Sequence, residues 1–143
     1  IRQWQHENGV EDLIVVTPSG TGTTAYYLAA SLKEATVVTI PVVGDAVYLR
    51  RQMHLLGPIP ANLQIIEAPK KHHFARPCPE LLASYRELLE AGLEVDLIYG
   101  AKMWHDLLEY ADMDVKRSVL YLHSGGLIGN ETMLERYRYK GIL

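Results

Sequence analysis

The chain has 143 residues, of which 48% are hydrophobic and 22% charged, and its 14 Lys and Arg against 17 Asp and Glu give a formal net charge of −3. This length and composition are those of one globular domain with a buried core, and they exclude a disordered tail. The charge lacks the basic excess that nucleic acids and anionic membranes attract, so neither is expected as a partner. The single cysteine, Cys78, cannot form an internal disulfide, which favours a reducing compartment, the cytoplasm. No apolar run approaches the roughly 20 residues of a membrane span.

Strand and helix patterns alternate along the chain. The first residues look like the end of a helix that began upstream, because Asn8-Gly9 supplies residues that tolerate the left-handed conformation at helix ends. Short apolar runs predict strands at 13–17, 36–43, 62–67 and 118–123. Helical patterns follow at 25–34, 45–56, 79–91, 103–110 and 131–139. Strand-helix units in series predict an α/β three-layer sandwich with a mostly parallel sheet, and we expect residues 1–143 to form a single α/β domain.

The loop after the first predicted strand carries the strongest functional signal. It reads Ser19-Gly20-Thr21-Gly22-Thr23-Thr24 and leads into a helix. In open α/β sheets ligands bind at the carboxyl ends of the strands. Small residues at a helix N-terminus offer free N–H groups and a partial positive charge to a phosphate. We therefore expect an anion pocket at the N–H groups of Gly20 to Thr24, the alternative being a tight turn that uses small residues.

The loop sequence does not by itself identify which phosphate-containing ligand binds. A Walker A loop needs a lysine, and the first lysine of the chain is Lys33, which argues against an NTPase. Gly20, Gly22 and Ala25 satisfy the dinucleotide pattern G-x-G-x-x-A, and Asp45 follows the second strand, where a ribose-binding carboxylate would lie. A dinucleotide- or phosphate-ligand-binding α/β module without its own catalysis is therefore an alternative.

Three segments together resemble one enzyme family. Residues 19–24 are similar to S-G-S-G-G-T, residues 95–103 (V-D-L-I-Y-G-A-K-M) to L-D-P-V-Y-T-G-K-A/M, and residues 122–127 (L-H-S-G-G-L) to I-H-T-G-G-L. These motifs belong to the 1-aminocyclopropane-1-carboxylate (ACC) deaminase and D-cysteine desulfhydrase family of fold-type II pyridoxal-phosphate enzymes. They occur here in the family's order and span most of the chain.

The resemblance implies an enzyme with pyridoxal 5'-phosphate as cofactor. The intact protein would act on ACC, D-cysteine or a related small amino acid, as a deaminase or lyase that releases ammonia and a 2-oxo acid, and it could form a homodimer. In this sequence, Ser19 to Thr24 would hold the cofactor phosphate, Ser124 would hydrogen-bond the pyridine nitrogen, and Tyr99 would be the catalytic tyrosine. Because one ring cofactor must reach all three, Tyr99 and Ser124 are expected at the same sheet edge as Gly22.

The sequence also departs from the family's pattern. Thr23 replaces a glycine, Leu97 replaces a proline, and Gly100 replaces a Thr, Ser or Glu beside the pyridine ring. The family's Schiff-base lysine lies upstream of the phosphate loop, and this chain has no lysine before Lys33. We therefore expect the chain to be the C-terminal, cofactor-binding fragment of a longer enzyme, inactive without the missing N-terminal portion.

No metal site is expected. The loop at 70–77 contains the adjacent His72 and His73, but no carboxylate or third ligand is spaced to complete a metal shell. His105 is expected on a helical surface. A role for His72 or His73 toward the substrate would rest only on their position in a loop that follows a strand.

Overall fold

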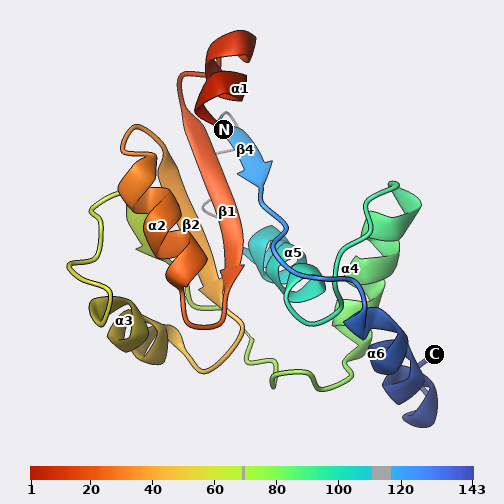
Figure 1. Ribbon diagram of the computed structural model, residues 1–143. Helices are drawn as coiled ribbons and strands as arrows, with labels where there is room; N and C mark the ends of the chain where they lie inside the picture. The colour runs from red at the N-terminus through yellow and green to blue at the C-terminus, as the bar shows by residue number, and fades with distance from the viewer. Residues whose placement is uncertain (69, 111–116) are drawn as a thin grey trace. The chain divides into compact units, whose positions relative to one another are not determined.

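The computed structural model describes residues 1–68, 70–110 and 117–143. These residues form two compact units, one with residues 1–67 and 117–122 and the other with residues 68, 70–110 and 123–143. Figure 1 shows the helices and strands of both units. That the whole chain is a single domain, and that it is a C-terminal fragment, stay predictions.

The first unit is built on a four-stranded sheet. Its strands are β1 (Leu13–Ser19), β2 (Thr36–Pro41), β3 (Leu63–Ile65) and β4 (Ser118–Tyr121). They lie in the order β3-β2-β1-β4, and all neighbouring pairs are parallel. The predicted α/β class is thereby confirmed, and a parallel sheet with flanking helices is consistent with the predicted three-layer sandwich.

The central strand of this sheet is β1. All seven of its residues are buried, and Val15 lies opposite Val37 of β2 on one side and Leu120 of β4 on the other. A strand that is paired on both edges and buried along its whole length has no solvent-facing side, so its sequence reads as a continuous apolar run.

Three helices belong to the first unit: α1 (Arg2–Asn8), α2 (Thr23–Ser31) and α3 (Ala46–His54). Helix α2 packs across β1 and β2 (Figure 1). Ala25 and Ala29 are fully buried at this contact, because their small side chains let the helix lie close to the strands. The packing of α2 on β1 fixes the loop between them, which is the predicted phosphate loop.

The second unit contains α4 (Pro79–Glu90), α5 (Gly100–Glu109) and α6 (Gly129–Tyr139). Helix α4 packs against α5, and both contribute buried side chains, among them Leu81, Leu88 and Met103. Tyr137 of α6 is fully buried, and its hydroxyl donates to the carbonyl of Cys78 at 3.1 Å, which ties α6 to the start of α4. None of the helices that the structure describes could cross a bilayer.

The predicted elements are all present, with ends shifted by at most three residues. The largest shifts are the start of α5, at Gly100 where 103 is predicted, and the end of α2, at Ser31 where 34 is predicted. The early end of α2 has a tertiary cause. The Nδ2 group of Asn62 donates to the carbonyls of Ala29, Leu32 and Ala35, at 3.1, 2.9 and 2.8 Å. The carbonyls at and just beyond the last turn therefore share one donor group that lies outside the helix.

Candidate functional site

The loop between β1 and α2 leaves a row of backbone donors free. Gly22 precedes the first residue of α2 with φ of 83°, and no side chain caps the helix there. The first helical bond runs from the N–H of Tyr26 to the carbonyl of Gly22, at 2.9 Å. Within the described part of the chain, the N–H groups of Gly20 to Thr24 donate to no acceptor. Unpaired N–H groups at a helix N-terminus are the backbone elements of a phosphate site.

The hydroxyl groups of this loop have different surroundings. Ser19 is the last residue of β1 and not the first residue of the loop, and its buried Oγ lies 2.7 Å from Oγ1 of Thr39 on β2. Thr21 and Thr23 are exposed, with their hydroxyl oxygens 3.3 Å apart. Thr24 is exposed at the start of α2. The accessible hydroxyls of the loop are therefore those of its three threonines, whereas that of Ser19 is engaged inside the sheet.

Gly22 is also required by packing. A Cβ at this position would lie 2.4 Å from Cε of Met53 and 2.8 Å from Cδ1 of Leu49, both on α3. The positive φ is a second reason, since L-residues with side chains rarely adopt it. The glycine therefore lets α3 and the turn approach each other, whether or not a ligand is bound.

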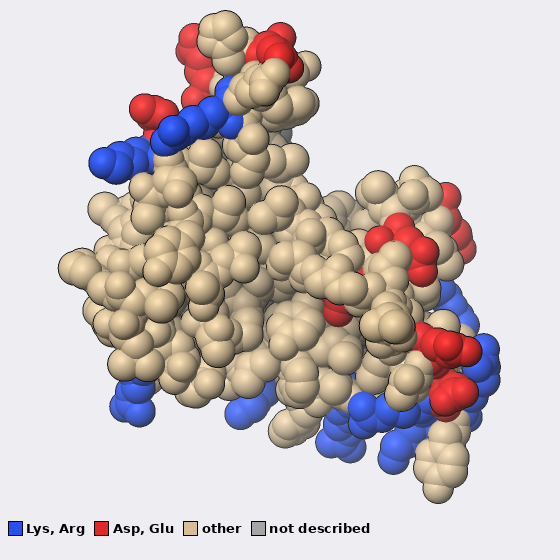
Figure 2. Space-filling model, viewed as in Figure 1, with Lys and Arg blue, Asp and Glu red and all other residues tan. Residues whose placement is uncertain are grey.

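The segment that contains the loop carries no charged residue. Residues 13–32 contain no Lys, Arg, His, Asp or Glu, and Figure 2 shows the surface over the first turns of α2 without charged side chains. An anion at this loop would be held by backbone N–H groups, threonine hydroxyls and the helix dipole. No carboxylate of this segment would repel it.

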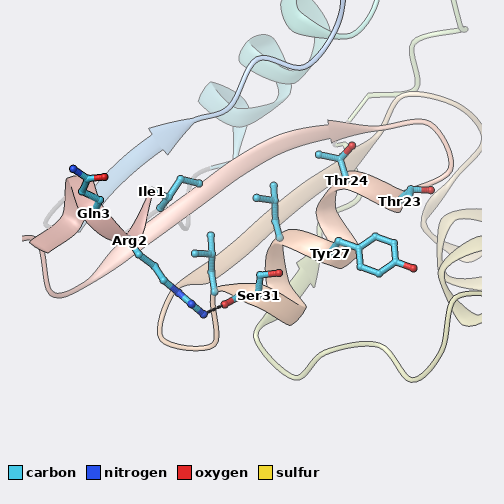
Figure 3. A pocket seen from close by; sticks show the side chains of 9 residues that line it. Ile1, Arg2, Gln3, Thr23, Thr24, Tyr27 and Ser31 are labelled. Carbon is cyan, nitrogen blue, oxygen red and sulfur yellow. Dashed lines mark hydrogen bonds between the residues drawn. The ribbon is translucent and has the colours of Figure 1, made fainter.

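A cavity of about 750 Å³ lies beside the first turn of α2. Thr23 and Thr24 contribute to its wall together with Tyr27, and residues of α1 form the opposite side (Figure 3). Arg2 reaches across from α1 and donates to the carbonyl of Ser31 at the far end of α2. The cavity thus follows one side of α2 from its start to its end, and the predicted loop residues border it at one end.

In the second unit, Asp96 organises the segment before α5. Its buried carboxylate accepts the N–H groups of Ile98, Tyr99 and Gly100, at 3.0, 2.6 and 2.8 Å. A carboxylate is favourable at the start of a helix because it satisfies free donors and faces the positive end of the helix dipole. This arrangement fixes the backbone at Tyr99, the predicted catalytic residue.

His123 joins the two predicted motifs of this unit. Its Nε2 atom lies 3.2 Å from both the backbone N and Oδ2 of Asp96. Residues 95–103 and 123–127, which are separated in sequence, are therefore brought together as neighbours. Ser124 follows His123 and is half-buried, and its hydroxyl forms no hydrogen bond among the residues described.

Tyr99 is half-buried, and its ring packs edge-on against Phe74, with ring centroids 5.9 Å apart. The next residue, Gly100, has a structural explanation for its departure from the family's pattern. A Cβ there would lie 2.7 Å from Cβ of Val95 and 3.1 Å from Oδ2 of Asp96. A side chain at 100 would therefore displace the turn that holds Tyr99.

Sequence reasoning missed Asn130, near the start of α6. This side chain is buried, its Oδ1 accepts the N–H of Leu97 at 2.9 Å, and its Nδ2 donates to the carbonyl of Val95 at 2.9 Å. It holds the backbone on either side of Asp96. An asparagine in the first turn of a helix ordinarily indicates a local cap, so nothing in the sequence pointed to a partner more than 30 residues away.

Asp45, the predicted ribose-binding residue of the alternative function, caps α3. Its Oδ1 accepts the N–H of Tyr48 at 2.7 Å. The carboxylate thus has a structural partner in its own helix. The loop Gly20–Thr24 belongs to the first unit and both Tyr99 and Ser124 to the second, so their predicted position at one sheet edge stays a prediction.

Comparison with known proteins gives one informative result. No protein-family model and no curated protein matches the sequence. A crystal structure of an ACC deaminase homologue superposes with a TM-score of 0.70 and 19% sequence identity, over 91% of this chain and 44% of that one. The chain therefore shares the fold of that protein and spans less than half of its length.

Proposed function

We propose that this chain is the cofactor-binding part of a pyridoxal-phosphate-dependent deaminase or desulfhydrase. The substrate is a small amino acid such as ACC or D-cysteine, and the products include ammonia and a 2-oxo acid. The observation that carries the proposal is the row of unpaired N–H groups from Gly20 to Thr24 at the start of α2. The shared fold with an ACC deaminase homologue supports it.

The loop fits the phosphate group of this cofactor. A phosphate needs several donors that converge without a competing carboxylate, and the loop offers backbone N–H groups and the hydroxyls of Thr21, Thr23 and Thr24 in a neutral segment. Ser19 contributes indirectly, because its hydroxyl bonds Thr39 and holds the end of β1. When bound, pyridoxal phosphate supplies an electron sink for the substrate's carbanion.

Ser124 and Tyr99 have distinct assigned roles. The free hydroxyl of Ser124 can donate to an unprotonated pyridine nitrogen or accept from a protonated one, which leaves the ring less positive than a carboxylate partner would. The phenol of Tyr99 is assigned to proton movement at its Oη atom, since the backbone bonds to Asp96 hold this residue in place.

The experiment is a binding assay with pyridoxine 5'-phosphate, which carries the phosphate but no aldehyde to react with surface lysines. We expect saturable binding by calorimetry, and none of comparable affinity for pyridoxine, which lacks the phosphate. Thr23→Asp places a negative charge in the first helical turn. It should weaken binding about tenfold or more, on the order of the repulsion between charges a few ångströms apart.

Thr23→Asn is the matched control, with the same shape and no charge. Because an acidic residue in the first turn favours the helix dipole, Thr23→Asp should fold at least as stably as Thr23→Asn. Loss of affinity without loss of stability therefore reports the anion site. Equal affinity of the two variants would refute the phosphate loop. Tighter binding of NAD than of pyridoxine 5'-phosphate would favour the dinucleotide module instead.

A further inference from the structure

A buried polar cluster lies within the second unit. It consists of His72, from the loop before α4, and His105 and Asp106 of α5. The side chain of His72 is 4% exposed and that of Asp106 is fully buried. His105 lies on a helix, as expected, but its side chain is only 14% exposed and so is not at the open surface.

Several polar atoms of this cluster have no hydrogen-bond partner among the described residues. They are Nδ1 and Nε2 of His72, Nε2 of His105 and Oδ1 of Asp106. Buried polar atoms are ordinarily hydrogen-bonded, so a buried group of atoms without such bonds calls for a missing partner. A neutral imidazole has one donor nitrogen and one acceptor nitrogen, so each histidine can offer one ligand atom to a metal ion, and Oδ1 of Asp106 can offer another.

We propose that His72, His105 and Asp106 form a binding site for a divalent transition-metal ion of the zinc class. Their ligand atoms all lie within 4.8 Å of one another. Nδ1 of His72 and Oδ1 of Asp106 are 3.7 Å apart, too long for a hydrogen bond and close to the roughly 3.3 Å between two ligands of a tetrahedral zinc ion. Two imidazoles with one carboxylate suit zinc better than calcium or magnesium, which prefer oxygen ligands.

Neighbouring side chains orient the donors. Oγ of Ser84 lies 3.3 Å from Nδ1 of His105, which orients the ring when Nδ1 carries the proton. Nε2 is then the ligand atom, and Oε1 of Glu109 lies 3.4 Å from it, so an ion at this site would have to compete with that contact. Lys102 pairs with Oδ2 of Asp106 and leaves Oδ1 free. The rings of His72 and His105 meet edge-on with centroids 5.2 Å apart, so neither ring covers the face of the other.

A second group of ligand types shares His72 but is already engaged. Sγ of Cys78 donates to Oε2 of Glu80 at 2.6 Å, and Oε1 of Glu80 pairs with Lys70. We therefore choose His105 and Asp106, and not Cys78 and Glu80, as the metal-binding partners of His72. Three protein ligands leave a fourth position of a tetrahedral ion open to water or a small ligand.

Lys102 is the group that opposes a cation at this site. Its ammonium neutralises Asp106 and is itself buried, with a side chain 6% exposed. Replacing it with an uncharged residue of similar length should therefore raise the affinity for a metal ion. If the Lys102–Asp106 ion pair is only structural, the opposite result is expected. Lys102→Met would then leave Asp106 unpaired, lower the stability of the fold and not increase metal binding.

The experiment titrates Co²⁺ and Zn²⁺ into the chelator-treated protein. We expect one ion per chain, the visible absorption of four-coordinate Co²⁺, displacement of Co²⁺ by Zn²⁺, and a higher melting temperature with saturating Zn²⁺. His72→Ala should lower the affinity at least tenfold, whereas His73→Ala, which changes the adjacent exposed histidine, should not. Lys102→Met should raise the affinity severalfold.

If His72→Ala fails to fold by circular dichroism, Asp106→Asn provides the same comparison with nearly unchanged shape. Equal binding by the His72→Ala and His73→Ala variants, or a Co²⁺ spectrum of six-coordinate surface histidines only, would overturn the site. None of these readouts depends on pyridoxal phosphate, so the proposed function and the metal site can fail separately.

Discussion

Glu80 shows how two hydrogen bonds to one carboxylate lower its pKa at the start of a helix. It lies in the first turn of α4, where one carboxylate oxygen accepts from the Cys78 thiol and the other pairs with Lys70. The bond from Cys78, and then the bond from Lys70, lower the pKa of Glu80 to about 2. Burial and the same contact raise the pKa of the Cys78 thiol, which keeps it protonated and a weak nucleophile.

We predict that Glu80 titrates near pH 2, well below an ordinary glutamate. Because its pKa is lower in the folded chain than in the unfolded chain, its contribution to stability is present above pH 4.5 and is lost as the pH falls toward 2. Carboxyl NMR titration measures the value directly. The stability difference between wild type and Glu80→Gln should shrink over the same pH range, and a Glu80 midpoint above pH 4 would contradict the contact.

At the scale of elements, the two ends of α2 differ in how their backbone groups are hydrogen-bonded. The carbonyls near its C-terminal end receive the amide of Asn62, whereas the N–H groups at its N-terminal end have no acceptor in the described chain. A helix whose own chain satisfies one end and leaves the other open is suited to bind an anion at the open end. The contrast supports the assignment of the loop before α2.

We predict that Asn62→Asp destabilises the chain more than Asn62→Ala. The alanine variant removes the donor and should cost about 1–3 kcal/mol, because partly buried carbonyls lose their partner. The aspartate has the same shape but places a negative charge against three carbonyl oxygens, so its cost should be larger. Urea unfolding measures both values. Gln64→Glu, the same amide-to-acid change at an exposed position of β3, is the control and should have little effect.

At the scale of the whole molecule, the chain has the fold of an ACC deaminase homologue but corresponds to 44% of its length. All lysines of the chain follow the proposed phosphate loop. The resemblance implies that the reacting lysine precedes this loop, where this sequence has no lysine. Binding of the cofactor phosphate and turnover of substrate should therefore separate experimentally.

We predict that the 143-residue chain alone does not turn over D-cysteine or ACC, although it binds pyridoxine 5'-phosphate. An amine must be held against the cofactor's aldehyde carbon for catalysis, and a phosphate loop alone cannot do this. Assays for 2-oxo acid release, together with borohydride trapping and peptide mass spectrometry, test the prediction. One stoichiometric pyridoxyl-lysine with turnover would show that the chain holds its own catalytic lysine.

Much of the fold could be predicted from local sequence. The β-branched run at 13–17 predicted the central strand, and Asn8-Gly9 predicted the end of α1. The glycine-threonine loop predicted a helix that follows it, with a start at 25 where the structure has Thr23. These features depend on periodicity, backbone conformation and residue size within a few neighbouring positions. These properties depend on local sequence alone, so they can be predicted without knowing which distant residues come into contact.

Other features were decided by tertiary structure alone. Ser19 is engaged by Thr39, Asn130 holds the backbone around Asp96, and His72 meets a histidine and a carboxylate more than 30 positions further along the chain. In each case the partner lies 20 or more residues away. Hydrophobic periodicity indicates which face of an element is buried but not which residue of another element it meets. Packing selects that partner, and with it the polar groups that end up together in the core.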